Sequence, residues 1–246
     1  MRVAAAAAAA VLVLALPAGA GAEDAGRGRD LYFSACAQCH GPDLQGIDRE
    51  ARVGAGDNRV LGPPLRGVGA GAADFYLRTG YMPLRDPYEQ PTRTHPKFSE
   101  RDLRALVAFV GSFGGQGVPR VRPERGDTGL GSVVFTENCA GCHQVVGEGG
   151  IVTGARVPSL KEASATQIAE AVRVGPYVMP RFSERQISQH ELDSLVRYVL
   201  YARDPDDKGG WALEHLGPVP EGIVAWLLAG GVLLVVARLI GEGLKR

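Results

Sequence analysis

The sequence predicts a mostly helical protein with two small tandem domains and one membrane-spanning helix, and three observations lead to this prediction. The string Cys-x-x-Cys-His occurs twice, and each copy is followed in the same half of the chain by a Met-Pro pair. Apolar residues recur at helical spacing after each Met-Pro pair. Residues 222–237 form an apolar stretch without charge near the C-terminus. We therefore expect an all-α fold.

Residues 1–22 have the pattern of a secretory signal peptide. A basic start at Arg2 is followed by an apolar run, by Pro17 and by the small residues 20–22, where cleavage is expected. An uncleaved membrane anchor is the competing interpretation, but the run is rich in alanine and weakly hydrophobic for a stable span. In either case, the residues that follow leave the cytoplasm.

The doubled Cys-x-x-Cys-His string indicates two covalently bound haem c groups. Two thiols three positions apart on a helical turn can each form a thioether to one porphyrin, and the next residue places an imidazole under the iron. A zinc knuckle would need further clustered Cys or His ligands, and a thioredoxin-like pair would open a βαβ unit. The predicted attachment points are Cys36, Cys39, Cys139 and Cys142, and the predicted axial ligands are His40 and His143.

A methionine is expected as the second axial ligand of each iron, because a haem that only carries electrons usually has both axial positions filled. Met82 and Met179 each precede a proline, which disfavours a helical conformation for the methionine. The ordinary alternative is a methionine that fills a gap in the core, and such a residue would more often lie at helical apolar spacing.

Histidines outside the two motifs are the rivals for these positions. His95 precedes a proline in a polar loop, His190 falls in the first turn of a predicted helix, and His215 adjoins the membrane segment. A solvated or boundary position explains each of them better. We therefore predict His/Met ligation for both haems.

The two halves of the chain are copies of one unit. Each has a short helix before the motif, then a Pro-x-Leu, a helix ended by a glycine, and the string Phe-Ser-Glu-Arg before a final helix. The helices before the motifs are predicted over 28–35 and 130–138, and those ended by Gly80 and Gly175 over 72–79 and 165–174. Capping boxes are expected at Ser164/Gln167 and Ser188/Glu191, and the predicted core stripes of the final helices are Leu103, Leu106, Val107 and Val110 in the first unit and Leu192, Leu195, Val196 and Val199 in the second.

The units differ after the Met-Pro pair, where the first carries an insertion over 84–97 that is rich in proline and charge. Such a loop is either a solvated excursion or a surface for a partner, and the sequence leaves both possibilities open. Residues 114–129, rich in Gly, Pro and Arg, join the two units and are expected to form an extended linker.

The charge pattern places the chain at a membrane surface and not on nucleic acid. The formal net charge is zero, which gives no argument for nucleic-acid binding. Acidic Glu214 and Glu221 precede the apolar stretch, whereas Arg238, Lys245 and Arg246 follow it. The positive-inside rule then puts the C-terminus in the cytoplasm and both haem domains outside.

These observations give a complete domain organisation. The predicted boundaries are a signal peptide at 1–22, a first haem domain at 23–118, a linker at 119–128, a second haem domain at 129–206, a linker at 207–217, a transmembrane helix at 218–240 and a cytoplasmic tail at 241–246.

The chain resembles the dihaem cytochrome c subunit, called cytochrome cc, of the actinobacterial menaquinol–cytochrome c reductase. The resemblance covers essentially the whole mature chain and rests on the tandem motifs, the insertion after Met82-Pro83, the segment 178–183 and the Gly-Pro-x-Pro-Glu-Gly string over 217–222. It implies two tandem class I cytochrome c-like domains and partnership with cytochrome b, a Rieske iron-sulfur protein and a terminal oxidase. The chain would carry electrons between the Rieske centre and the oxidase, as an enzyme subunit without its own substrate site.

The residues alone stop at a membrane-tethered, outward-facing carrier of two haems. Two other functions stay open at this point. One is a dihaem enzyme such as a peroxidase or a thiosulfate dehydrogenase, although two candidate methionine ligands speak against an open iron. The other is the electron-accepting subunit of a periplasmic dehydrogenase.

Overall fold

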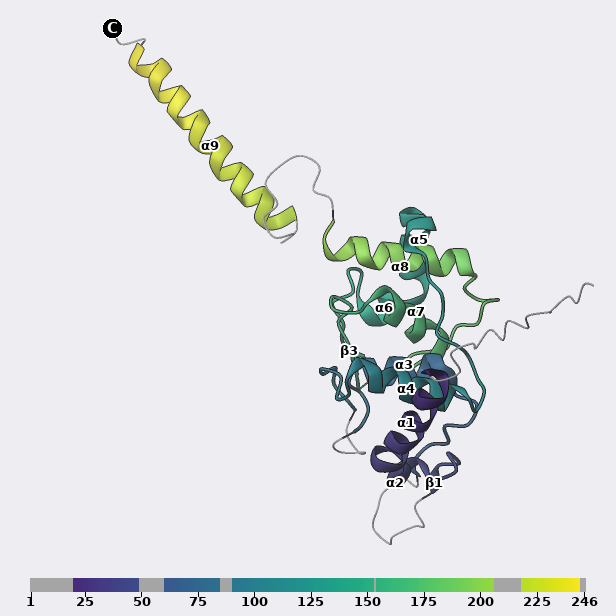
Figure 1. Ribbon diagram of the computed structural model, residues 1–246. Helices are drawn as coiled ribbons and strands as arrows, with labels where there is room; N and C mark the ends of the chain where they lie inside the picture. Colours follow the sequence, from purple (N-terminus) through teal and green to yellow (C-terminus); the bar gives the residue numbers. More distant parts are fainter. Residues whose placement is uncertain (1–19, 49–59, 85–89, 153, 206–217, 244–246) are drawn as a thin grey trace, which may run out of the picture. The chain divides into compact units, whose positions relative to one another are not determined.

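The computed structural model describes residues 20–48, 60–84, 90–152, 154–205 and 218–243 (Figure 1). The chain divides into two compact units, a larger one that ends at Leu200 and a smaller one that starts at Tyr201. Both predicted haem domains fall almost entirely in the larger unit. Most of the predicted signal segment and all of the predicted linker over 207–217 lie outside the described residues.

The first half of the larger unit is helical, with one short hairpin. Its elements are α1 (Ala20–Ala35), α2 (Ala37–His40), β1 (Ile47–Asp48), β2 (Val60–Gly62), α3 (Gly69–Arg78) and α4 (Glu100–Gly111). The second half repeats this order after η1 (Pro123–Arg125), with α5 (Thr128–Asn138), α6 (Ala140–His143), β3 (Gly150–Val152), β4 (Ala155–Val157), α7 (Ala165–Val174) and α8 (Gln189–Arg203).

The predicted all-α class and the internal repeat are confirmed, and the capping signals lie where the sequence places them. Helix α7 runs from Ala165 to Val174, begins at a complete Ser164/Gln167 capping box and ends at Gly175 in the left-handed conformation. The Ser188/Glu191 box is also present, because each backbone N–H donates to the other residue's side chain. These side-chain oxygens satisfy donors that a helix start leaves without a partner.

Two features differ from the expected helices. Helix α1 begins at Ala20 instead of Gly28 and α3 at Gly69 instead of Ala72, and no proline lies in either added stretch. Each half also has an antiparallel hairpin, which pairs Ile47 with Gly62 in the first and Gly150 with Val157 in the second. Strands of two or three residues are too short to show an alternating pattern in the sequence.

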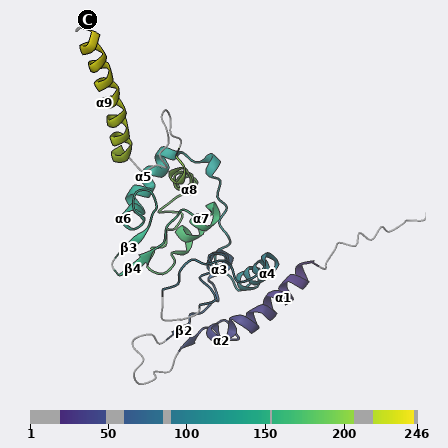
Figure 2. The ribbon, with the colours of Figure 1, turned by 90° about the vertical axis from the view of Figure 1, so that its left-hand side faces the viewer.

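The helix that enters each motif crosses the final helix of its unit at a glycine. A Cβ added at Gly28 in α1 would clash with the backbone of Ala105 in α4, and one added at Gly131 in α5 would clash with the backbone of Ser194 in α8. One turn further on, Tyr32 and Phe135 are buried at the two crossings. Burying each aromatic side chain contributes about 1.5–3 kcal/mol. Figure 2 shows α4 beside α1.

The predicted core stripes are confirmed. Leu192, Leu195, Val196 and Val199 are all buried in the second half. In the first half, Val107 is partly buried beside the fully buried members of its stripe. Each half thus has an apolar core of its own.

The segment 90–94 of the insertion contacts the second half of the same chain. The Gln90 side chain donates to the Arg156 carbonyl oxygen at 2.6 Å and accepts from the Arg156 N–H at 2.8 Å. The Arg93 guanidinium donates to Gln167 Oε1 at 2.7 Å and to the Glu162 carbonyl oxygen at 3.1 Å. This part of the insertion therefore forms an interface within the chain. The sequence had suggested a solvated loop or a surface for a partner, and the described part is neither.

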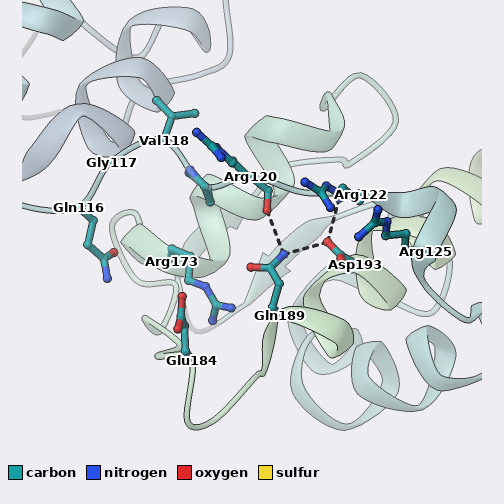
Figure 3. Close-up of a pocket in the computed structure, with 11 residues that line it drawn as sticks. Gln116, Gly117, Val118, Arg120, Arg122, Arg125, Arg173, Glu184, Gln189 and Asp193 are labelled. Carbon is teal, nitrogen blue, oxygen red and sulfur yellow. Dashed lines mark hydrogen bonds between the residues drawn. The ribbon is translucent and has the colours of Figure 1, made fainter.

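The residues that join the two halves are held by side chains of the second half. The Arg120 carbonyl oxygen accepts from Gln189 Nε2, and the Arg122 N–H donates to Asp193 Oδ1 (Figure 3). Together with Arg173 and Glu184, these residues line a pocket that includes neither Cys-x-x-Cys-His motif nor either Met-Pro pair. The linker is thus ordered by hydrogen bonds on the surface of the second half.

The smaller unit consists mainly of α9 (Pro218–Gly243), whose described side chains are almost all apolar and exposed. Its 26 residues span about 39 Å at about 1.5 Å per residue, which exceeds the hydrocarbon core of about 30 Å. Within the described residues, Gly222–Gly243 is long and apolar enough to cross a membrane.

The two halves of the larger unit also meet where α3 packs on α7 (Figures 1 and 2). A buried carboxyl group lies in this contact. Glu170 of α7 is completely buried, and among the described residues neither of its carboxyl oxygens has a hydrogen-bond partner. Asp74 of α3 faces it and is held by Arg78 at 2.8 Å. Burial and the negative charge of Asp74 together raise the pKa of Glu170 to about 9, against the smaller opposing effect of Arg78.

This raised pKa predicts that the larger unit loses stability as the pH rises. The folded chain keeps the Glu170 proton up to about pH 9, whereas an unfolded chain releases it near 4.5. The stability that comes from holding this proton is therefore fully present below pH 4.5. As the pH rises toward the pKa of the folded chain, the free energy of unfolding falls by up to about 1.4 kcal/mol per pH unit. Thermal unfolding followed by circular dichroism at pH 5 and pH 8 measures this loss of stability.

Glu170→Gln should flatten this pH dependence, because the amide cannot ionise. The matched control is Glu137→Gln, at an exposed position of the same half, and it should keep the wild-type slope. An unchanged slope in Glu170→Gln contradicts the assignment of this proton.

Candidate haem sites

Each Cys-x-x-Cys-His motif forms a single helical turn that begins at its first cysteine. In the first, the N–H groups of Cys39 and His40 donate to the Cys36 carbonyl oxygen at 3.0 and 2.9 Å. In the second, Cys139 accepts from Cys142 and His143 at 3.1 and 2.9 Å. Residues three and four positions apart share one face of a helix, so this geometry would allow both thiols and the imidazole of a motif to bind one ligand.

The imidazole of each motif is fixed by a backbone carbonyl. His40 Nδ1 lies 2.7 Å from the Pro63 carbonyl oxygen, and His143 Nδ1 lies 3.2 Å from that of Pro158. A carbonyl oxygen only accepts, so Nδ1 carries the hydrogen and Nε2 keeps its lone pair. Both side chains are buried, and burial lowers the pKa of His143, which favours the neutral, metal-binding form.

The loop after each motif is also repeated, in a way that the sequence analysis missed. Gly46 and Gly149, each six positions after its histidine, adopt left-handed conformations and donate their N–H groups to His40 and His143. Further along, the Leu65 N–H donates to Leu44 in the first half, as the Leu160 N–H does to Gly147 in the second. A glycine at a fixed distance after each motif was the available signal, but neither glycine stands out in a glycine-rich chain.

Gly62 leaves room for the first motif. A Cβ at this position would clash with the Cys39 carbonyl oxygen and would lie 3.1 Å from His40 Nδ1. Only a residue without a side chain therefore lets β2 approach the α2 turn closely enough for Pro63 to accept from the imidazole.

The two methionines lie in loops that follow α3 and α7, and each joins the apolar cluster of its own half. Met82 is half-buried in the cluster that includes Cys36, and Met179 is half-buried in the cluster that includes Cys139. Each backbone is tied to the preceding turn, since the Met82 N–H donates to Tyr76 and the Met179 N–H to Pro176, both at 3.0 Å. The Met82-Pro83 peptide bond is cis. The fold thus places each methionine in the cluster of its expected cysteine.

The environment of the first cysteine in each motif favours an uncharged sulfur. Burial raises the pKa of Cys36 and of Cys139 to about 11, and the second cysteine of each motif adds to the effect. Both sites therefore favour an uncharged sulfur, and a thioether, which has no ionisable proton, is uncharged at every pH. In the described part of the chain, no group of three or more His, Cys, Asp or Glu side chains could hold a metal ion by itself.

The rival histidines lie away from these clusters where they are described. His95 and His190 are both exposed to solvent. His215 lies outside the described residues. The residues present therefore fit two porphyrins, each with nitrogen and sulfur donors and an apolar surround.

Comparison with known proteins decides the family. The model described as Cytochrome c matches residues 25–113, and the one described as Cytochrome C oxidase, cbb3-type, subunit III matches residues 126–199. A Corynebacterium diphtheriae protein named cytochrome bc1 complex cytochrome c subunit is 37% identical, and the match covers 87% of this chain and 79% of that protein. The chain belongs to the family of cytochrome bc1 complex cytochrome c subunits. The Mycobacterium tuberculosis protein of the same name is 34% identical over 87% of this chain and 76% of its own length.

Two solved structures align with this chain at low similarity. A chain of a Kuenenia stuttgartiensis reducing HAO-like protein complex aligns with a TM-score of 0.36 and 17% identity, covering 72% of this chain and 95% of its own. A thiosulfate dehydrogenase from Marichromatium purpuratum aligns with a TM-score of 0.30 and 18% identity, covering 83% of this chain and 52% of its own. Neither score supports an inference about fold or function.

Membership of this family, together with the two cytochrome c domains, establishes the cofactors and the general function. The cytochrome bc1 complex cytochrome c subunit carries two covalently bound c-type haems and transfers electrons in a respiratory chain. The apolar α9 fits the membrane anchor of such a subunit.

Gly62→Ala is predicted to impair the first haem site alone. The new methyl group would push β2 away from the α2 turn and weaken the hydrogen bond between His40 and Pro63. Such a bond contributes about 1 kcal/mol, and more when the buried donor is left without a partner. We expect less haem on the peptide that contains Cys36 and Cys39, or a shifted potential of that haem. Mass spectrometry of tryptic peptides and redox titration measure the two effects.

Gly117→Ala is the matched control for this substitution. Gly117 has no atoms within 4 Å of an added Cβ, and its φ lies outside the left-handed range. It should keep both haems at their wild-type potentials. Equal haem content and potentials in the two variants would contradict the close approach at Gly62.

Proposed function

We propose that this chain is a membrane-anchored relay in which each haem iron is held between a histidine and a methionine. The proposed axial pairs are His40 with Met82 and His143 with Met179. The proposed thioether positions are Cys36, Cys39, Cys139 and Cys142. The observation that carries the proposal is the double construction: each half has a buried imidazole that donates to a proline carbonyl oxygen and a methionine in the same apolar cluster as the motif.

The chain's own residues perform ligation and tuning. When bound, each haem iron takes up and gives back one electron. The hydrogen bond from the imidazole to the proline carbonyl holds the ring orientation and makes Nε2 a stronger donor. A thioether from methionine raises the potential above that of a second histidine. The apolar clusters exclude water, so little solvent has to reorganise when the charge of the iron changes.

The proposal also names the proteins that give electrons to this chain and take electrons from it. We place the chain between the Rieske iron-sulfur protein and the terminal oxidase, in a complex with cytochrome b. Support comes from the family, whose members are named subunits of the cytochrome bc1 complex. Proton translocation and quinol oxidation belong to the complex, and this chain contributes electron transfer to its reductase activity.

The proposed topology puts both haem domains on the extracytoplasmic side. The signal-like segment 1–22 would export them, the helix over 218–240 would be the single anchor, and the tail over 241–246 would lie in the cytoplasm. The haem domains would cover 23–118 and 129–206, with linkers at 119–128 and 207–217. Support comes from the length of α9 and from the basic residues that follow residue 237.

The ligand assignment predicts the effect of removing either sulfur. Met82→Ala and Met179→Ala should each lower the potential of one haem by about 100 mV or more and open one iron to carbon monoxide. Each should also remove part of the weak near-infrared band that comes from charge transfer between sulfur and ferric iron. Redox titration and carbon monoxide difference spectra measure the changes.

His95→Ala is the control for the methionine variants. This histidine is exposed, so its removal should change neither potential. A methionine variant that keeps both potentials and the full near-infrared band would contradict its ligand assignment.

The proposed partners are tested by purification in a mild detergent. A tagged full-length chain, expressed in its native host, should bring down cytochrome b and the Rieske protein, and the assembly should oxidise a menaquinol with this chain as an intermediate carrier. Recovery with a soluble dehydrogenase in place of these proteins would redirect the assignment to the electron-accepting subunit of that enzyme.

A further inference from the structure

Three tyrosine rings form a contact between the two halves of the larger unit. Tyr76 lies in α3 of the first half, Tyr81 follows that helix, and Tyr177 comes from the second half. The ring centroids of Tyr76 and Tyr177 are 5.9 Å apart, those of Tyr81 and Tyr177 are 6.0 Å apart, and those of Tyr76 and Tyr81 are 6.4 Å apart. Edge-to-face and tilted pairs at these separations are favourable aromatic contacts.

The tyrosine cluster, defined as Tyr76, Tyr81 and Tyr177, connects the two candidate methionine ligands. Tyr81 directly precedes Met82, and the Tyr76 carbonyl oxygen accepts the Met82 N–H at 3.0 Å. Tyr177 lies two residues before Met179 on the other side of the interface. The cluster is therefore a continuous chain of covalent bonds, one hydrogen bond and ring contacts from one methionine loop to the other.

The backbone of Tyr177 is held in an unfavourable conformation. Its φ is +55°, in the left-handed region that a bulky residue rarely adopts. Such a conformation costs about 1–3 kcal/mol and persists only where the surrounding structure fixes it. The ring contacts with Tyr76 and Tyr81 are the contacts of this side chain across the interface. The fold therefore keeps the Tyr177 ring at this position although its backbone conformation costs free energy.

The three phenol groups stay neutral. Burial is the largest cause that raises the pKa of each of them. The cluster therefore adds aromatic bulk between the two methionine loops without placing a charge there. A neutral aromatic medium suits the passage of an electron because it does not trap the electron electrostatically.

We propose that the tyrosine cluster is the path by which an electron tunnels between the two haems. The inference rests on the proposed ligation by Met82 and Met179. One electron leaves a ferrous iron and reduces a ferric iron; no bond forms or breaks, and no proton moves on the tyrosines. The polar contacts made by Gln90 and Arg93 hold the same two halves together at other points of the interface.

The test measures electron redistribution inside the full-length protein in detergent. A laser flash with a soluble ruthenium tris-bipyridine complex delivers less than one electron per molecule to the oxidised protein. The slower absorbance change whose rate does not depend on protein concentration reports transfer between the haems. Its rate is compared among variants whose potentials and near-infrared band are measured in parallel.

Tyr177→Leu and Tyr76→Leu should slow this phase. Removing a ring leaves a gap without atoms in contact across it, and because tunnelling decays steeply with distance we expect a slowing of about tenfold. Tyr177→Phe keeps the ring contacts and should stay within about twofold of the wild-type rate. Tyr76 lies in α3, and Tyr76→Leu keeps the backbone carbonyl oxygen that accepts the Met82 N–H, so this substitution tests the path even if Tyr177→Leu displaces Met179.

Two controls separate the path from simple cohesion of the interface. Arg93→Ala removes the hydrogen bonds to Gln167 and Glu162 without removing a ring of the cluster. Tyr201→Leu removes a tyrosine that lies outside the cluster and is about as exposed as Tyr177. Both should keep a rate close to that of the wild type. A wild-type rate in Tyr76→Leu, or equal slowing in Arg93→Ala, overturns the inference. Absence of the near-infrared band from the wild-type protein would instead refute the methionine ligation on which the inference rests.

Discussion

The hydrogen bond between each motif histidine and a proline carbonyl is the constraint on which the rest of each haem site depends. It joins the one-turn helix that carries the cysteines to the segment that follows the short hairpin. The left-handed glycines at 46 and 149 bend the loop so that this segment returns to the motif, and Gly62 lets it approach closely in the first half. An imidazole oriented in this way presents one defined nitrogen to a metal.

Two copies of this construction would function separately if the halves did not touch. The contact between them combines three kinds of chemistry: hydrogen bonds from the insertion, a buried carboxyl group between α3 and α7, and a cluster of tyrosine rings beside the methionines. The insertion distinguishes the first half from the second, and its described part provides contacts that the second half could not make with an identical copy of itself. The insertion thus makes the two halves an asymmetric pair with a defined interface.

The interface is polar but contains few free charges. Glu170 holds a proton, and Arg78 neutralises Asp74 and Glu100 on the first half. Unpaired charges buried between two redox centres would shift their potentials and would cost free energy to desolvate. Neutral aromatic rings and neutralised carboxyl groups avoid both effects, which suits a protein that carries electrons.

The sequence by itself determined the motifs, the repeat, the helix caps at Ser164 and Ser188, and the apolar helix near the C-terminus. These features depend on short-range rules, such as ligand spacing, helical periodicity and capping chemistry, which act within a few residues. Only the tertiary structure decided what the insertion contacts, that Pro63 and Pro158 accept from the imidazoles, and that Tyr177 meets Tyr76 and Tyr81. Those contacts join residues far apart in the chain, and they depend on how the two halves pack, which no local pattern encodes.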